Sequence, residues 1–263
     1  MKTKMATLGI LAMISSLACA QEPADKLIEM PLGADCTYIG QGSSGVPNGY
    51  GMLTYSNGTQ YRGRTFPEDG RFTGVKTDSS GSVFIGDYIR EMPADSMTIV
   101  GPDDSIYVGQ IKNGQAEGRG TYIASGCVYV GEYQAGQMNG FGTMRCSDGR
   151  IYAGEVKDGL SNGQGCTWHA NGDVANGTYI SNTLNGKASY IYTHSDTFAR
   201  YDGDFKDGLR SGEGVFRWKN GHVYTGTYAN NMRNGFGTLD QGNGTVQTGQ
   251  WKDDEFIGEE KPE

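Results

Sequence analysis

Two short segments hold residue types that carry catalysis or bind metal ions in other proteins. His194–Asp196 (His-Ser-Asp) contains the side chains of a hydrolytic triad, and Cys166–His169 (Cys-Thr-Trp-His) places a thiol and an imidazole three residues apart. The members of a triad are brought together by the fold rather than by adjacency in sequence. A zinc site needs three or four ligands, and no second such pair lies near Cys166. We therefore interpret His194–Asp196 as a solvated loop and predict no catalytic residue, no metal site and no cofactor.

Glycine-rich stretches such as Gly118–Gly120 could in principle bind phosphate groups through the backbone. They recur, however, in a pattern that runs through most of the chain. An aromatic residue followed by x-Gly returns in steps of 22 to 26 residues, most of them 23, with first residues Tyr38, Tyr61, Phe84, Tyr107, Tyr129, Tyr152, Tyr201 and Tyr224 and two weaker copies at Ala175 and Gln247. This recurrence favours a structural role for the glycines.

Each repeat predicts one β-hairpin. Counting from its first residue, the third is always Gly, the fifth is often aromatic, the twelfth and fourteenth are mostly Gly, and the sixteenth is mostly apolar. Both halves alternate with period two, which is typical of strands. Polar segments with Asn-Gly or Asp-Gly, such as Asn57-Gly58 and Asp148-Gly149, predict the turns. We expect an all-β fold, an elongated antiparallel meander of about ten hairpins in one twisted sheet.

The glycines also suggest how a chain poor in Leu could bury a core. A strand glycine leaves space above the sheet, and we expect an aromatic ring from the neighbouring strand to fill it. Stacked rings would then form a continuous row, so that each hairpin buries its aromatic face against its neighbours.

This pattern resembles the MORN repeat (membrane occupation and recognition nexus). A clear copy runs from Tyr129–Tyr133 (YVGEY) to Gly140–Met144 (GFGTM), and the resemblance spans Tyr38 to about Gly258. Three copies depart from it: the Tyr61 copy has Glu68 and Phe72, the Phe84 copy has Glu91, Asp95 and Met97, and the Ala175 copy has Ala188 and three extra residues. We therefore expect a bent or bulged first half and a protruding loop at residues 193–200.

The N-terminus reads as an export signal. Residues 1–20 contain Lys2 and Lys4, a short apolar run, and the small-x-small site Ala18-Cys19-Ala20. Cleavage after Ala20 is one interpretation, and lipidation at Cys19 is the other. We expect residues 1–20 to be the signal, 21–37 an N-terminal segment, 38–258 the repeat array and 259–263 a tail. The periplasm, the outer membrane or the exterior is then the expected location.

Charge narrows the classes of partner. The net charge is −8, and −10 without residues 1–20. Nucleic acids and anionic lipids bind clustered Lys and Arg, whereas here the cations stand singly. This balance disfavours both as main partners, although lipidation could still anchor the chain to a membrane.

Four cysteines remain outside the signal, and an oxidising compartment permits disulfides. Cys127 opens one predicted strand and Cys146 closes its partner, so we predict a Cys127–Cys146 bond, with free thiols as the alternative. Cys166 should lie too far from Cys146, because another strand separates them.

The repeats leave 17 residues before Tyr38 and 5 after Gly258 outside the signal, so we expect no separate catalytic domain. We predict a non-enzymatic scaffold that binds a protein or peptide through an aromatic-lined groove, with the side chains Tyr50, Phe141, Trp168, Trp218 and Phe236. A carbohydrate or cell-wall binding protein is the alternative, since exposed rings also stack on sugars. A hydrolase or transferase with its site on the sheet is a third hypothesis.

Overall fold

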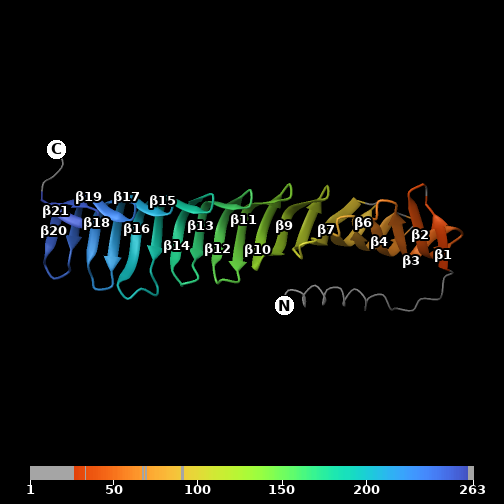
Figure 1. Cartoon of the computed structure of the whole chain (residues 1–263), viewed down its shortest axis with the longest axis horizontal. Helices are drawn as coiled ribbons and strands as arrows, with labels where there is room; N and C mark the ends of the chain where they lie inside the picture. Colours follow the sequence, from red (N-terminus) through yellow and green to blue (C-terminus); the bar gives the residue numbers. More distant parts are fainter. Residues whose placement is uncertain (1–26, 33, 67, 69, 90–91, 260–263) are drawn as a thin grey trace. The chain divides into compact units, whose positions relative to one another are not determined.

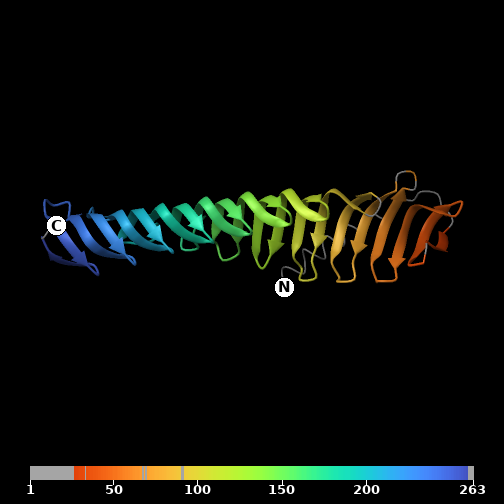
Figure 2. The same ribbon diagram turned by 90° about the horizontal axis from the view of Figure 1, so that it is seen from above.

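The computed structural model describes residues 27–32, 34–66, 68, 70–89 and 92–259, which form β-strands and turns. The predicted all-β antiparallel meander is confirmed (Figures 1 and 2). Within this described part, no helix has the length and apolar character that a membrane span requires. The predicted export signal with Cys19, the beginning of the 21–37 segment, Glu91 and the last four residues of the tail lie outside the described residues.

The chain divides into two compact units, of which the first holds the described residues up to Ser125 with Tyr133–Gly136. Its strands are β1 (Leu27–Pro31), β2 (Cys36–Ser43), β3 (Val46–Tyr55), β4 (Gln60–Phe66), β5 (Arg71–Thr77), β6 (Val83–Ile89), β7 (Met92–Val100), β8 (Ile106–Lys112) and β9 (Gln115–Ala124). β10 (Cys127–Gln134) is divided between the units. The strands of the second unit are β11 (Gln137–Cys146), β12 (Ile151–Lys157), β13 (Leu160–Trp168), β14 (Val174–Ile180), β15 (Thr183–Ile191), β16 (Phe198–Lys206), β17 (Leu209–Trp218), β18 (Val223–Ala229), β19 (Met232–Asp240), β20 (Val246–Lys252) and β21 (Glu255–Gly258).

Inside each unit, successive strands pair antiparallel, and the register places the glycines of the third and fourteenth positions opposite one another. Gly109 pairs with Gly120 in the first unit, and Gly154 pairs with Gly165 in the second. The same pairing occurs at Gly40–Gly51, Gly203–Gly214 and Gly226–Gly237. We call the space over each such pair the glycine gap.

The first-position tyrosine of a hairpin fills the glycine gap of that hairpin. A Cβ atom at Gly120 would lie 2.6 Å from Cε2 of Tyr107, and one at Gly109 would lie 2.6 Å from the hydroxyl of the same ring. The expectation that the ring comes from the neighbouring strand is therefore incomplete, because the ring lies diagonally across both strands. Any side chain at either glycine would displace the ring.

A β-bulge follows the third-position glycine in most hairpins and receives the tyrosine hydroxyl. The register shifts between Gly109 and Ile111, and the hydroxyl of Tyr107 donates a hydrogen bond of 2.7 Å to the carbonyl of Gln110 inside this bulge. The equivalent bonds are Tyr38–Gln41 at 2.6 Å, Tyr129–Glu132 at 3.3 Å, Tyr152–Glu155 at 2.6 Å, Tyr201–Asp204 at 3.1 Å and Tyr224–Thr227 at 3.3 Å. Burial raises the pKa of Tyr224 to about 12, so this hydroxyl is protonated and can donate at neutral pH.

The side chain of the bulged fourth residue makes a second hydrogen bond across the hairpin, to the backbone of the partner strand. Oε1 of Gln110 accepts a hydrogen bond of 2.7 Å from the backbone N–H of Arg119, the thirteenth residue. Gln41–Tyr50, Glu132–Phe141, Glu155–Gln164 and Asp204–Glu213 repeat this contact at 2.7 to 3.0 Å. The polar fourth residue is therefore a structural part of the repeat.

Aromatic rings join one hairpin to the next. A first-position tyrosine meets the fifth-position ring of the following hairpin edge-on, with centroids 5.1 to 5.6 Å apart, in the pairs Tyr61–Tyr88, Tyr107–Tyr133, Tyr152–Tyr179, Tyr201–Tyr228 and Tyr224–Trp251. The first-position tyrosines are only 0 to 9% exposed. We call this buried row in each unit the tyrosine spine, and the side of the sheet that carries it the spine face.

The departing hairpins fill their glycine gaps differently. Over Gly63 and Gly74 the ring of Phe72 replaces that of Tyr61, and over Gly86 the side chain of Met97 takes its place. The bulges predicted for the first half occur there, after Gly40, Gly86 and Gly109. They are not specific to that half, since the second unit has them as well, and the departing β4–β5 hairpin runs without a register shift.

The predicted loop at residues 193–200 is too long. β15 ends at Ile191, Ile191 pairs with Arg200, and β16 begins at Phe198. The ring of Phe198 packs 5.5 Å from that of Phe216, and this apolar contact draws the last three residues of the predicted loop into the sheet.

The predicted disulfide between Cys127 and Cys146 is present, and the Cα atoms of the two residues are 4.0 Å apart. Cys166 lies on β13, and β12 separates it from β11, which ends at Cys146.

The glycine gap predicts that Gly142→Ala destabilises the second unit by about 1–3 kcal/mol, because a methyl group at this site overlaps the ring of Tyr129. Urea unfolding followed by circular dichroism measures the change. Thr143→Ala, on the adjacent and exposed position of β11, should leave the unfolding midpoint almost unchanged. Equal midpoints for the two variants would contradict the explanation.

The hydrogen bond to the bulge predicts that Tyr152→Phe lowers the free energy of unfolding by about 1 kcal/mol, since the carbonyl of Glu155 loses its donor. Tyr50→Phe is the control, because Tyr50 is 46% exposed and a lost hydroxyl there leaves no buried acceptor. The account fails if thermal unfolding moves both variants by the same amount.

Candidate binding site

The His194–Asp196 segment forms a local turn and does not have triad geometry. The hydroxyl of Ser195 accepts hydrogen bonds from the backbone N–H groups of Thr197 and Phe198, at 3.2 and 2.9 Å. Nδ1 of His194 lies 2.9 Å from the hydroxyl of its neighbour Thr193. The arrangement therefore gives Ser195 the role of a turn-capping residue.

Cys166 and His169 do not form the start of a metal site. Burial raises the pKa of the Cys166 thiol and lowers that of the His169 imidazole. His169 follows β13 and packs 5.6 Å from the ring of Tyr190 on the spine face. Nowhere in the described part of the chain do three metal-ligating side chains gather.

The four predicted partner-binding residues of the second unit do not form one aromatic groove. Tyr50 belongs to the first unit and the other four to the second. Phe141 and Trp168 are 63% and 41% exposed, on separate strands. Trp218 packs 4.6 Å from Phe216 in the spine. Of the five, Phe236 lines the large hollow described next.

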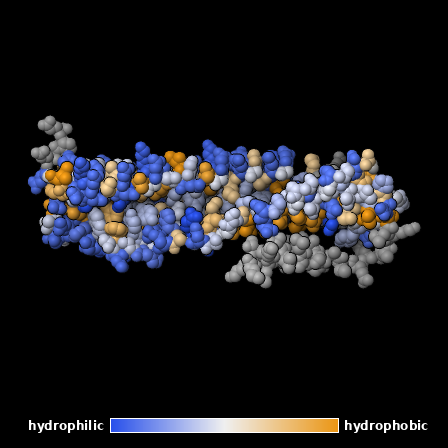
Figure 3. Space-filling model, in the orientation of Figure 1, coloured by the Kyte–Doolittle hydropathy of each residue, from blue (hydrophilic) through white to orange (hydrophobic). Residues whose placement is uncertain are grey.

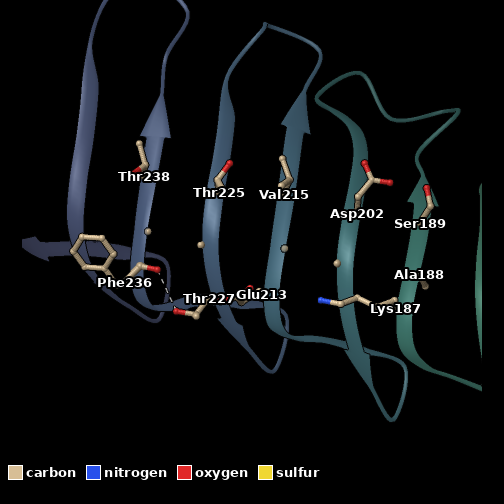
Figure 4. Close-up of a pocket in the computed structure, with 14 residues that line it drawn as sticks. Lys187, Ala188, Ser189, Asp202, Glu213, Val215, Thr225, Thr227, Phe236 and Thr238 are labelled. Carbon is tan, nitrogen blue, oxygen red and sulfur yellow. Dashed lines mark hydrogen bonds between the residues drawn. The ribbon is translucent and has the colours of Figure 1, made fainter. Parts of the chain in front are cut away.

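A trough of about 890 Å³ crosses β15 to β19 on the face opposite the spine (Figure 4). Its side chains form two rows. The lining glycines Gly214, Gly226 and Gly237 each stand in the sequence between one residue of the first row and one of the second. One row holds Lys187, Glu213, Thr227 and Phe236, and the other holds Ser189, Asp202, Val215, Thr225 and Thr238. Short and hydroxylated side chains thus line most of the trough, with one aromatic ring near its end.

Most charges of the trough are already paired. Asp202 lies 2.7 Å from Arg200 and 3.3 Å from Arg217, and Asp204 lies 2.9 Å from Lys187. Glu213 is the exception: its backbone N–H donates to Asp204, and its exposed carboxylate has no ion-pair partner among the described residues. A ligand in the trough would therefore meet one unpaired negative charge.

The hydroxyl of Thr227 fixes the end of the trough. It donates at 2.6 Å to the carbonyl of Asn234 and lies 3.3 Å from that of Phe236. Thr227 holds the fourth position, where Gln, Glu or Asp stands in most other copies. The sequence interpretation missed this column, although tabulating the fourth residue of each repeat would have revealed it.

The surface around these sites is mixed in character. Figure 3 shows hydrophilic side chains interspersed with separate hydrophobic patches on the visible side of the second unit. Most aromatic rings pack in the spine, where the first-position tyrosines are buried. On the face opposite the spine, a partner can therefore contact polar side chains and backbone groups at the same site.

Two solved structures with which this chain was compared are weakly similar to it. The SAS-4 (dCPAP) TCP domain of Drosophila melanogaster, solved with a proline-rich motif of Ana2 (dSTIL), is 11% identical and gives a TM-score of 0.28. The match covers 89% of this chain and 97% of that domain. A catalytically inactive virginiamycin B lyase from Staphylococcus aureus, solved with quinupristin, is 13% identical over 85% of this chain and 87% of its own, with a TM-score of 0.17. Scores this low carry no argument about function.

A search of curated protein sequences finds no match. The family model of the MORN repeat matches six segments, at residues 38–60, 107–128, 129–149, 152–174, 201–223 and 224–246. These segments make up just over half of the chain, and they are the six copies in which a tyrosine hydroxyl binds the bulge carbonyl. The chain belongs to the MORN-repeat family.

Proposed function

We propose that this chain is an exported, non-enzymatic scaffold that binds an extended segment of a protein partner in the trough of β15–β19. The observation that carries the proposal is the difference between the two faces of the sheet. The rings of the spine face are buried against one another, whereas the opposite face presents an open trough with an unpaired acid and a half-buried ring. MORN repeats are often protein-binding modules, which agrees with this use.

The trough suggests the chemistry of the bound segment. Glu213 lies on β17 and Phe236 on β19, in the same row (Figure 4). Neighbouring strands are about 4.8 Å apart, so the two side chains are about 10 Å from each other. In a polyproline II conformation, which has three residues per turn and rises about 3.1 Å per residue, side chains three positions apart lie on the same side about 9 Å from each other. A segment in this extended conformation, with a basic residue and an apolar residue three positions apart, would meet both groups.

Export is the second part of the proposal and rests on the order of charged, apolar and small residues in 1–20. The Cys127–Cys146 bond agrees with it, because disulfides persist in oxidising compartments. Whether the mature chain begins at a lipidated Cys19 or at Gln21 decides between membrane anchoring and a freely diffusing form.

Binding is tested by crosslinking the mature chain to its partner in its own cells, identifying the partner by mass spectrometry and measuring its affinity. Phe236→Ala and Glu213→Lys should each weaken binding about tenfold. Phe141→Ala is the matched control, since Phe141 holds the same repeat position on β11 but lies outside the trough. An unchanged affinity for both trough variants, or a glycan as the only ligand recovered, would refute the proposal.

The same sample tests export through the N-terminal peptide. We expect the peptide to start at Gln21 or at a lipid-modified Cys19 in the envelope or the medium. An intact Met1 on the partner-bound chain in the cytoplasm would contradict export without affecting the trough.

A further inference from the structure

A second hollow lies on the spine face of the second unit, around the Ala175 hairpin. Its volume is about 500 Å³, and its walls include Tyr152, Tyr179, Leu184, Tyr190 and Phe205. Ala175 is also part of its lining and is buried, at 2% exposure. The trough described above lies on the opposite face, so this hollow is independent of the proposed function.

The repeat itself explains why the spine is hollowed here. Ala175 occupies the first position, where most other copies have an aromatic ring. The gap that such a ring would fill lies over Gly177 and Ala188, and a Cβ atom at Gly177 would run into the methyl group of Ala188. The other departing hairpins fill their gaps with the ring of Phe72 or the long side chain of Met97. The Ala175 hairpin therefore places a single methyl group where its neighbours place much larger groups.

The remaining walls are suited to a ring. Tyr152 and Tyr179 meet edge-on, with centroids 5.4 Å apart, and rings arranged in this way offer edges and faces to a further aromatic group. Tyr190 adds a third ring that is held by a hydrogen bond of 3.3 Å to Asp173. These rings belong to two successive hairpins, β12–β13 and β14–β15, so the sheet fixes the walls.

The lining is almost free of charge. The one charged side chain in it is Arg150, and its guanidinium is already paired with Asp148 at 2.7 Å. Ser161, Asn182 and Thr183 supply polar atoms at the rim. This combination favours a neutral ligand with an apolar body and one hydroxyl or N–H group.

We propose that the hollow around Ala175 binds a small neutral aromatic molecule of the size of phenol or indole, which completes the row of rings that the sequence interrupts. The ring of the ligand contacts Tyr152 and Tyr179, and its polar group faces the rim. A hollow of this size is within the range of small-molecule sites in proteins, which is about 300–1,000 Å³.

The test restores the missing ring. The double variant Ala175→Tyr with Ala188→Gly completes the MORN pattern, so its tyrosine ring should lie over Gly177 and take space from the hollow that Ala175 lines. Indole and phenol are titrated into the mature full-length chain by isothermal calorimetry and by ligand-observed NMR. We expect both compounds to bind the unaltered chain and the affinity of the double variant to fall at least tenfold, while its melting temperature stays equal or rises. The melting temperature excludes unfolding as the cause of the loss.

The single variant Ala175→Tyr is the matched control for the mechanism. Its ring meets the methyl group of Ala188, so we expect a lower melting temperature than for the double variant. Cyclohexanol, which is similar in size to phenol but not aromatic, should bind at least tenfold more weakly than phenol.

Three results would overturn the proposal. One is the absence of indole and phenol binding by the unaltered chain at millimolar concentrations. Another is full binding by the double variant. The third is a tyrosine- or tryptophan-containing peptide that competes with indole and binds more than tenfold tighter, which would make a peptide the occupant.

Discussion

The structure depends on one close contact, the ring of a first-position tyrosine lying across two paired glycines. The ring of Tyr107 reaches over Gly109 and Gly120 because neither residue has a side chain on that face. Its hydroxyl then reaches the carbonyl of Gln110 in the bulge. One residue type thus fixes the strand register, satisfies a bulged carbonyl group and supplies the apolar surface that the next hairpin covers.

This contact makes the repeats interdependent. A single hairpin has few apolar side chains besides its rings, and the ring in its gap is shielded by the fifth-position ring of the following hairpin. Repeat proteins of this kind gain stability from nearest-neighbour interfaces rather than from one central core. The contact between ring and glycines also makes the two faces of the sheet different. The spine face buries the rings, and the opposite face carries the side chains of the alternate residues, which line the trough of β15–β19.

Much of this could be predicted from the sequence because the period and the alternation are strict. The hairpins, the glycine columns and the pairing of Cys127 with Cys146 follow from counting residues along paired strands. The binding surface could not be predicted in the same way. Trp218 lies on the spine face because it stands two residues after Phe216 on β17, whereas Trp168 stands one residue after the spine-facing Thr167 on β13. Counting positions within the repeat would have separated the two tryptophans, but the trough itself is shaped by the packing of neighbouring hairpins. The end of the 193–200 loop was misplaced for the same reason, since Phe198 finds its partner across the sheet.

The central claim is that the fourteenth-position glycine is required by the tyrosine ring that lies over it, and a double-mutant cycle at Tyr107 and Gly120 tests it most directly. Gly120→Ala is measured by urea unfolding in the unaltered chain and again in the Tyr107→Ala background. The account predicts that the cost of Gly120→Ala, about 1–3 kcal/mol beside the ring, falls to nearly zero once the ring is absent. The same cost in both backgrounds would contradict it.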